Sequence, residues 1–350
     1  MFEEKNILYE GKYGIKVEGK IYIVPPNPSL GYNCGFSLFI PKNCQEDTTL
    51  LVHSCNTGGH GVTDGKLDKN KTCYHIDEAN EAAKLSCINF NPGMWYASDL
   101  KMPVLTPLIP RVAGYYTHAL GSKVYHNDVS GLIEDQKNRN DDEKLSMEEI
   151  EKIRVQCMNL PEQLVNMIRA AKVFLDAKGI SVDDKVIMEG YSAGSKFANG
   201  FTALHPEVVK ALVCGGNSGF GILPIKELNG SSLNFPLGVN DVPNFNEEEF
   251  KSIPQLYYIG TSDYNDPAMY KCHFKKDKDG NYLKDQESYY IPVTDEKGNI
   301  IPILDENGKI KPRYSDNYTQ DEIIKIHTLL GSNPQTRFDN NIKMYNRLGV

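Results

Sequence analysis

The pentapeptide Gly190-Tyr191-Ser192-Ala193-Gly194 decides the fold of this chain. Residues 185–188, Lys-Val-Ile-Met, have strand character, and residues 195–205 have helix character. A strand, a Gly-x-Ser-x-Gly turn and a helix in this order are typical of a nucleophile elbow, which exposes the serine hydroxyl at the carboxyl end of the strand. Side chains beside so sharp a turn would collide, and glycine at both flanks avoids this. Chance alone gives the pattern about 0.1 times in such a chain, so the sequence predicts that Ser192 is a nucleophile.

The composition is that of an ordinary globular protein. The chain has 350 residues, of which 40% are hydrophobic and 24% are charged. There are 38 Lys and Arg residues against 46 Asp and Glu residues, which gives a net charge of −8. This acidic balance argues against nucleic acid or an anionic membrane as the main partner. No apolar run approaches the ~20 residues of a transmembrane helix, and the first residues do not have the pattern of a signal peptide.

The eight cysteines are scattered along the chain and form no Cys-x-x-Cys pair. A zinc site is therefore not expected, and no motif implies another metal or a cofactor. Several cysteines lie in or beside apolar runs, where a free cysteine acts as a small buried hydrophobic residue. This usage fits a reducing compartment, so the sequence favours a cytoplasmic location.

Apolar and amphipathic segments alternate along the chain. Within the N-terminal strands expected in 1–47, residues 7–25 predict an antiparallel hairpin that ends at Pro25-Pro26. Alternating strands and helices predict an α/β fold with a mostly parallel central sheet flanked by helices. The polar segment 126–146 is expected to be a surface loop. Further strands are predicted at 36–40, 48–52, 102–109, 185–189, 209–213 and 255–259, and helices at 76–87, 161–179, 195–205, 319–330 and 334–348.

Residues 267–318 depart from this alternation of strands and helices. Turn signals at 279–281, 297–299 and 307–309 separate short β-prone runs. We interpret the segment as an inserted β-ribbon and as a candidate lid. Residues 277–280, Asp-Lys-Asp-Gly, weakly suggest a calcium-binding loop, but the full ligand spacing is absent and a plain hairpin is favoured.

A serine hydroxyl becomes a nucleophile when a base takes its proton, and the base needs a third group to orient it. With an elbow of this kind, the acid follows a later strand and the histidine comes last. Asp263 stands just past Gly260, after the strand predicted at 255–259, so we expect it to be the catalytic acid. Asp266 is the alternative acid, and a turn or helix-cap carboxylate is the alternative role for Asp263.

Acyl transfer also needs hydrogen-bond donors for the oxyanion that develops on the substrate. The backbone amide of Ala193, directly after the serine, is one expected donor. The backbone amide of Cys55 is the other, because the loop at 53–61 follows an early buried strand and contains three glycines. A flexible glycine-rich loop without a catalytic part is the alternative, and a phosphate-binding loop is disfavoured because the Lys-Ser/Thr ending is missing.

Three stretches resemble α/β-hydrolase esterases. They are the pentapeptide at 190–194, Phe-Ala-Asn-Gly-Phe-x-x-Leu-His-Pro at 197–206, and Tyr-Tyr-Ile-Gly-x-x-Asp at 257–263. They are most similar to the poly(3-hydroxybutyrate) depolymerase-like and feruloyl-esterase-like group, and the resemblance covers residues 48–350 apart from the insertion. It implies one α/β-hydrolase domain over 1–350. It also implies a serine esterase that cleaves a small or oligomeric carboxylic ester through an acyl-enzyme intermediate without a cofactor.

The catalytic histidine is where the sequence departs from this family, whose members carry it after a last strand. The helix predicted at 334–348 resembles the one that precedes this strand, so we expect the chain as given to lack its last strand and its base, or to be inactive. His53 and His60 flank the loop at 53–61 and could approach the site, but either would be a new arrangement for the base. The eight histidines stand at positions 53, 60, 75, 118, 126, 205, 273 and 327.

Two other functions stay open at this point. An incomplete triad would leave a binding or structural protein on a hydrolase scaffold. The same elbow also serves peptidases and acyltransferases. The motifs specify neither the ester nor the oligomeric state.

Overall fold

The computed structural model describes most of the chain. The residues outside this description are 1–2, 11–13, 55–60, 69, 90, 116–119, 262, 264–265, 267, 285–290, 292, 297–299 and 312–317, together with the side chain of residue 138. The chain divides into two compact units. Unit 1 contains Met1–Asn217, Ile222–Tyr257 and Gly349–Val350, and unit 2 contains Ser218–Gly221 and Tyr258–Leu348. The expectation of a single domain over 1–350 stays a prediction.

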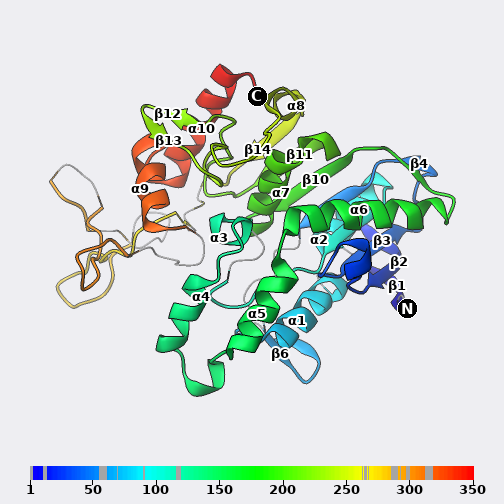
Figure 1. The fold of residues 1–350 in the computed structure, drawn as a ribbon, viewed down its shortest axis with the longest axis horizontal. Coiled ribbons are helices and arrows are strands. Elements are labelled where there is room, and N and C mark those ends of the chain that lie inside the picture. The colour runs from blue at the N-terminus through cyan, green and yellow to red at the C-terminus, as the bar shows by residue number, and fades with distance from the viewer. Residues whose placement is uncertain are drawn as a thin grey trace. The chain divides into compact units, whose positions relative to one another are not determined.

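An eight-stranded sheet forms the centre of unit 1 (Figure 1). Counted across the sheet in space, the first four strands are antiparallel to one another. The fourth to the seventh strand are parallel to one another. This topology confirms the predicted α/β-hydrolase class, including the N-terminal antiparallel hairpin. In spatial order the strands are β1 (Glu3–Glu10), β2 (Lys16–Val24), β3 (Phe36–Pro41), β8 (Val104–Pro107), β5 (Leu51–Ser54), β10 (Val186–Tyr191), β11 (Val209–Gly215) and β14 (Gln255–Tyr258), whose last residue belongs to unit 2.

Helices and three small two-stranded sheets complete the described elements. The small sheets pair β4 (Asp47–Thr48) with β9 (Ser181–Val182), β6 (Gly61–Thr63) with β7 (Lys66–Asp68), and β12 (Glu227–Leu228) with β13 (Ser231–Ser232). The α-helices are α1 (Ile76–Asn89), α2 (Pro92–Leu100), α3 (Ser122–Tyr125), α4 (Ser130–Asp135), α5 (Met147–Cys157), α6 (Leu160–Asp176), α7 (Ala193–Leu204), α8 (Glu247–Ser252), α9 (Gln320–Leu329) and α10 (Pro334–Leu348).

The central strands are buried on both faces, and each face packs into its own hydrophobic cluster. Leu51 of β5 and Ile187 of β10 face a cluster that includes Met94 and Ala97 of α2. The next residue on each of these strands turns to the opposite face, because side chains alternate along a strand. That second face packs against α6 and α7. The alternation therefore decides which side chains of β5 and β10 share a face with α2.

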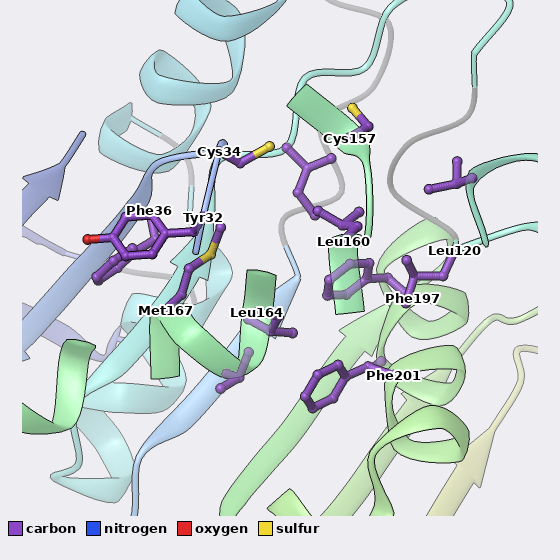
Figure 2. Close-up of a cluster of buried hydrophobic side chains, with 14 of the residues drawn as sticks. Tyr32, Cys34, Phe36, Leu120, Cys157, Leu160, Leu164, Met167, Phe197 and Phe201 are labelled. Atoms are coloured by element: carbon purple, nitrogen blue, oxygen red, sulfur yellow. The ribbon is translucent and has the colours of Figure 1, made fainter. Parts of the chain in front are cut away.

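The face that carries α6 and α7 holds the larger core. On α6, Leu164, Ile168 and Leu175 recur at helical spacing and are buried, as expected for an amphipathic helix whose apolar stripe faces a sheet. Figure 2 shows Leu160 and Leu164 of α6 in one cluster with Phe197 and Phe201 of α7. This packing holds the helix that follows the elbow in place.

In unit 1 the structure differs from two of the predictions made from the sequence. The segment 126–146, predicted as a loop, contains α4 and the 3₁₀ turns Gln136–Asn138 and Asp141–Glu143. Leu132 of α4 and Leu145 are buried, so two apolar residues anchor a segment whose composition is mostly polar. The strand predicted at 48–52 is shifted, since β5 runs to Ser54.

Unit 2 contains α9, α10 and the described part of 267–318. That part carries β-bridges between Lys276 and Tyr282 and between Leu304 and Ile310, which enclose the predicted turns at 279–281 and 307–309. A further bridge joins Thr294 to Ile300, and the turn predicted at 297–299 lies outside the described residues. The Asp277 carboxylate accepts the backbone amides of Asp279 and Asn281, as in a turn stabilised by its own side chain. The hairpins at 276–282 and 304–310 are also held by hydrogen bonds from the amides of Asp277 and Asp305 to the carbonyls of Asn281 and Lys309. A role as a lid stays a prediction.

Within the described residues, none of the helices combines the length and the apolar character needed to span a bilayer.

Candidate active site

Ser192 lies at the junction of β10 and α7 in a strained backbone conformation. Its φ is 56° and its ψ is −119°, a combination that costs energy for any residue with a side chain. Neighbouring backbone holds it there. The Ser192 amide donates to the carbonyl of Gly215 on β11 at 2.7 Å, and the Ser192 carbonyl accepts the Ser195 amide at 3.1 Å and the Ser195 hydroxyl at 2.7 Å. The turn therefore has the geometry of a nucleophile elbow.

The two flanking glycines are required by close backbone approaches. A Cβ atom at position 190 would lie 2.2 Å from the carbonyl oxygen of Gly194. A Cβ atom at position 194 would lie 2.4 Å from the carbonyl oxygen of Ser54. Both contacts are with backbone atoms, which cannot move aside as a flexible side chain can. The elbow is thus packed directly against the carboxyl end of β5.

The structure describes one of the two predicted oxyanion donors, Ala193. Ala193 is the first residue of α7, and the first amides of a helix have no acceptor within the helix. The positive end of the helix dipole also lies there, which favours a developing negative charge. Cys55, the other predicted donor, and His60 lie outside the described residues. Ser54, directly before Cys55, pairs with Gly190 across the parallel strands β5 and β10.

His53 lies inside β5 and not in the loop that follows. Its ring Nδ1 is hydrogen-bonded to the buried Glu189 carboxylate, and the two residues are direct partners across β5 and β10. Both side chains lie on the sheet face that carries α2, because they alternate with Val52 and Met188 of the opposite face. Sequence analysis missed Glu189. The available signal was an acidic residue between the apolar run Val-Ile-Met at 186–188 and Gly190.

The two candidate acids belong to unit 2 and differ in environment. Asp266 is buried, lies 2.5 Å from a guanidinium nitrogen of the fully buried Arg337, and accepts the Ala268 amide at 3.0 Å. Asp263 is half-buried, and its backbone is held by the Gly260 carbonyl and by the side chain of Gln335. Asp266 is therefore engaged in a buried ion pair with Arg337, whereas Asp263 is a half-buried residue.

His327 of α9 is the half-buried histidine of unit 2. Its Nε2 donates to the Ala268 carbonyl at 2.6 Å, and its ring centroid lies 4.5 Å from that of Tyr270. Burial lowers the pKa of His327 below its ordinary value, and the nearby positive charge of Arg337 acts in the same direction. The structure thus places Ser192 and Ala193 together in unit 1, and Asp263, Asp266 and His327 in unit 2.

Among the described residues, no three His, Cys, Asp or Glu side chains gather in a way that could hold a metal ion.

No protein-family model matches this sequence, and no curated protein matches it. Three similar solved structures belong to enzymes. Poly(aspartic acid) hydrolase-1 from Sphingomonas sp. KT-1 is 14% identical over 75% of this chain and 73% of that chain, with a TM-score of 0.37. The poly(3-hydroxybutyrate) depolymerase LpqC from Bordetella parapertussis is 13% identical over 99% of this chain and 77% of that chain, with a TM-score of 0.38.

Candida antarctica lipase A in its closed state is 12% identical over 61% of this chain and 41% of that chain, with a TM-score of 0.32. LpqC carries the name of the group that the three stretches of sequence resemble. Likenesses at these identities and scores say nothing about the substrate of this chain.

Proposed function

We propose that this protein is a serine hydrolase that cleaves carboxylic esters through an acyl-enzyme intermediate. The strained backbone of Ser192, between β10 and α7, is the observation that carries the proposal. A non-glycine residue holds such a conformation when the surrounding structure enforces it, and strain of this kind clusters at reactive sites. The turn presents the hydroxyl beyond the end of the strand, where a substrate carbonyl can reach it.

The roles proposed for the individual residues are those that the sequence motifs predict. The Ser192 hydroxyl oxygen attacks the ester carbonyl, and the amides of Ala193 and Cys55 stabilise the oxyanion. Asp263 orients the base. We prefer it to Asp266 because the Arg337 guanidinium already engages the Asp266 carboxylate. His53 is disfavoured as the base because its side chain is buried on the sheet face that carries α2, opposite the face that carries α7.

The substrate class proposed here is a small or oligomeric carboxylic ester, and a cytoplasmic location stays a prediction. The resemblance of the stretches at 190–194, 197–206 and 257–263 to α/β-hydrolase esterases supports the ester class. Turnover on esters of increasing acyl length, and on methyl esters of aromatic acids, would identify the preferred acyl group.

A fluorophosphonate probe tests the nucleophile, because it labels serines that are activated by their surroundings. We expect labelling of the full-length protein at Ser192, located by peptide mass spectrometry. Ser192→Ala should abolish both labelling and ester turnover while leaving the melting temperature nearly unchanged. Ser130→Ala, an exposed serine of α4, is the matched control and should keep both activities. An unlabelled Ser192, or full turnover in Ser192→Ala, would contradict the proposal.

A further inference from the structure

The buried, hydrogen-bonded pair of His53 and Glu189 lies directly before the elbow. Glu189 is three residues from Ser192, and the register of β5 and β10 places it opposite His53. The two side chains are only 5% and 10% exposed. They stand on the sheet face where the preceding alternate residues, Leu51 and Ile187, pack with apolar residues of α2.

The first turn of α2 encloses this pair. Its N-terminus is capped by the side chain of Asn91, which accepts the Gly93 amide at 2.9 Å. A Cβ atom at Gly93 would lie 2.8 Å from the His53 side chain, so α2 approaches the imidazole as closely as glycine allows. The ring of Tyr96 lies edge-on to the imidazole, with the centroids 6.3 Å apart.

Stability alone is a weak explanation for a buried polar pair at this place. Moving polar groups out of water carries a desolvation cost, and well-packed apolar residues of similar volume often serve a fold as well or better. The neighbouring positions on the same face are apolar, so the fold offers that alternative here. A hydrogen-bonded pair differs from apolar packing in its directionality, since it holds two backbones at a defined distance and register.

The two backbones that the pair joins are those that flank the nucleophile. From Glu189 the chain runs through Gly190 to Ser192. From His53 it runs to Ser54, whose carbonyl oxygen lies against Gly194 on the far side of the elbow. A shift between β5 and β10 at this level would therefore move both sides of the turn that holds Ser192.

We propose that His53 and Glu189 form a positioning pair that fixes the elbow against β5 and so sets the place of the Ser192 hydroxyl. This inference rests on the proposed function, because it assigns the pair a role in the reaction of Ser192. The pair touches no reacting atom. Its removal lowers the rate of attack by displacing the nucleophile, and a misplacement of about 1 Å can cost about 100-fold in rate.

The decisive variant of the full-length protein replaces both residues, His53→Leu together with Glu189→Leu. It removes both members of the pair together, so it should fold, whereas a single replacement would leave His53 or Glu189 buried without the other. We expect kcat on a reactive ester to fall about 100-fold with KM within twofold, and the rate of fluorophosphonate labelling to fall in parallel. A purely structural pair would change the melting temperature and leave kcat unchanged.

Glu189→Asp is the second variant, and it decides the question if the double variant does not fold. It keeps the charge and the hydrogen bond but shortens the side chain by one methylene, so the pair must draw the strands out of place. We expect about a tenfold loss in kcat at unchanged KM. Gln163→Leu is the matched control, because Gln163 of α6 is equally buried and hydrogen-bonded but lies away from the elbow. It should lower the melting temperature without changing kcat.

The outcomes separate this inference from the proposed function. Wild-type kcat and labelling rates in the folded double variant, or in Glu189→Asp, would overturn the positioning role while labelling of the unaltered protein still supports a reactive Ser192. An unaltered protein that is not labelled at Ser192 would overturn the proposed function, and the positioning role with it.

Discussion

At the scale of single residues, the elbow shows how local sterics and a long-range contact act on the same position. Gly190 is required by its own turn, because a Cβ atom there would meet the Gly194 carbonyl. Gly194 is required by a distant segment, because its Cβ atom would meet the Ser54 carbonyl of β5. The first requirement is readable from the pentapeptide, and the second depends on the sheet.

Gly194→Ala should therefore destabilise the protein and slow its reaction. The added Cβ atom would lie 2.4 Å from a backbone oxygen, so β5 or the elbow must shift. We expect a loss of about 1–3 kcal/mol in the free energy of unfolding, measured in urea, together with lower ester turnover. Gly131→Ala in α4 is the control, since its nearest neighbour is the flexible end of Lys123 at 3.2 Å. Equal stability in both variants would contradict this reading.

The two acidic candidates give a second prediction at this scale. Asp266→Asn removes the charge that faces the fully buried Arg337, and breaking a buried pair costs about 3–5 kcal/mol. Asp263→Asn alters a half-buried residue and should cost less stability than Asp266→Asn, while lowering ester turnover by orders of magnitude. Urea unfolding and kinetics on the same samples would check both. Full turnover in Asp263→Asn would remove it from the triad.

At the scale of elements, helix termini are held by polar side chains that join distant segments. Ser146 and Glu149 form a capping box at the start of α5. Glu149 also binds Nδ1 of His75, which directly precedes α1, at 2.7 Å. One carboxylate thus caps its own helix and ties α5 to α1.

This contact should make part of the stability depend on pH. The hydrogen bond to Glu149 raises the pKa of His75 above 6.5, and the same bond lowers the pKa of Glu149 below 4.5. The histidine contribution is fully present below its unfolded pKa and is lost as the pH rises through its folded pKa. The glutamate contribution is fully present above its unfolded pKa and is lost as the pH falls through its folded pKa. Both contributions to stability are fully present between pH 4.5 and 6.5.

His75→Gln should accordingly cost more stability at about pH 6 than at about pH 9. The pair is partly exposed, so the difference in the free energy of unfolding should stay below about 1 kcal/mol. Urea unfolding at both pH values would measure it. In a Glu149→Gln background the pH dependence should largely disappear, and an unchanged dependence there would point to another titrating group.

At the scale of the whole molecule, the core between the sheet and α6 and α7 supplies most of the burial in unit 1 (Figure 2). Leu164 of α6 is fully buried in this core, whereas Val173 of the same helix is 72% exposed. Burial and not helical propensity should therefore separate the effects of substitutions along α6.

Leu164→Ala should lower the free energy of unfolding by about 2–5 kcal/mol, because it leaves a cavity in close-packed surroundings. Val173→Ala should change it by less than about 0.5 kcal/mol, since the side chain is largely in water. Denaturant unfolding of the two variants makes a matched comparison within one helix. Similar losses in both would mean that α6 is not packed on the sheet as described.

The sequence by itself determined the elements whose cause is local. The elbow follows from two glycines around a serine, the hairpin from alternation in residues 7–25, and α6 from its periodic apolar residues, because each depends on sterics or periodicity within a few turns of chain. It also indicated the α/β class through the order of strands and helices. Position after a strand was enough to propose Asp263.

Only the tertiary structure decided which polar groups meet. The register of β5 against β10 places His53 opposite Glu189, and the approach of α10 to the start of unit 2 gives Asp266 its partner Arg337. In sequence these partners are separated by 136 and 71 residues, and no local pattern encodes such a distance. A strand register is set by the packing of both sheet faces at once. The chemistry of a residue could be read from the sequence, but its partner depended on contacts that exist only when the sheet is complete.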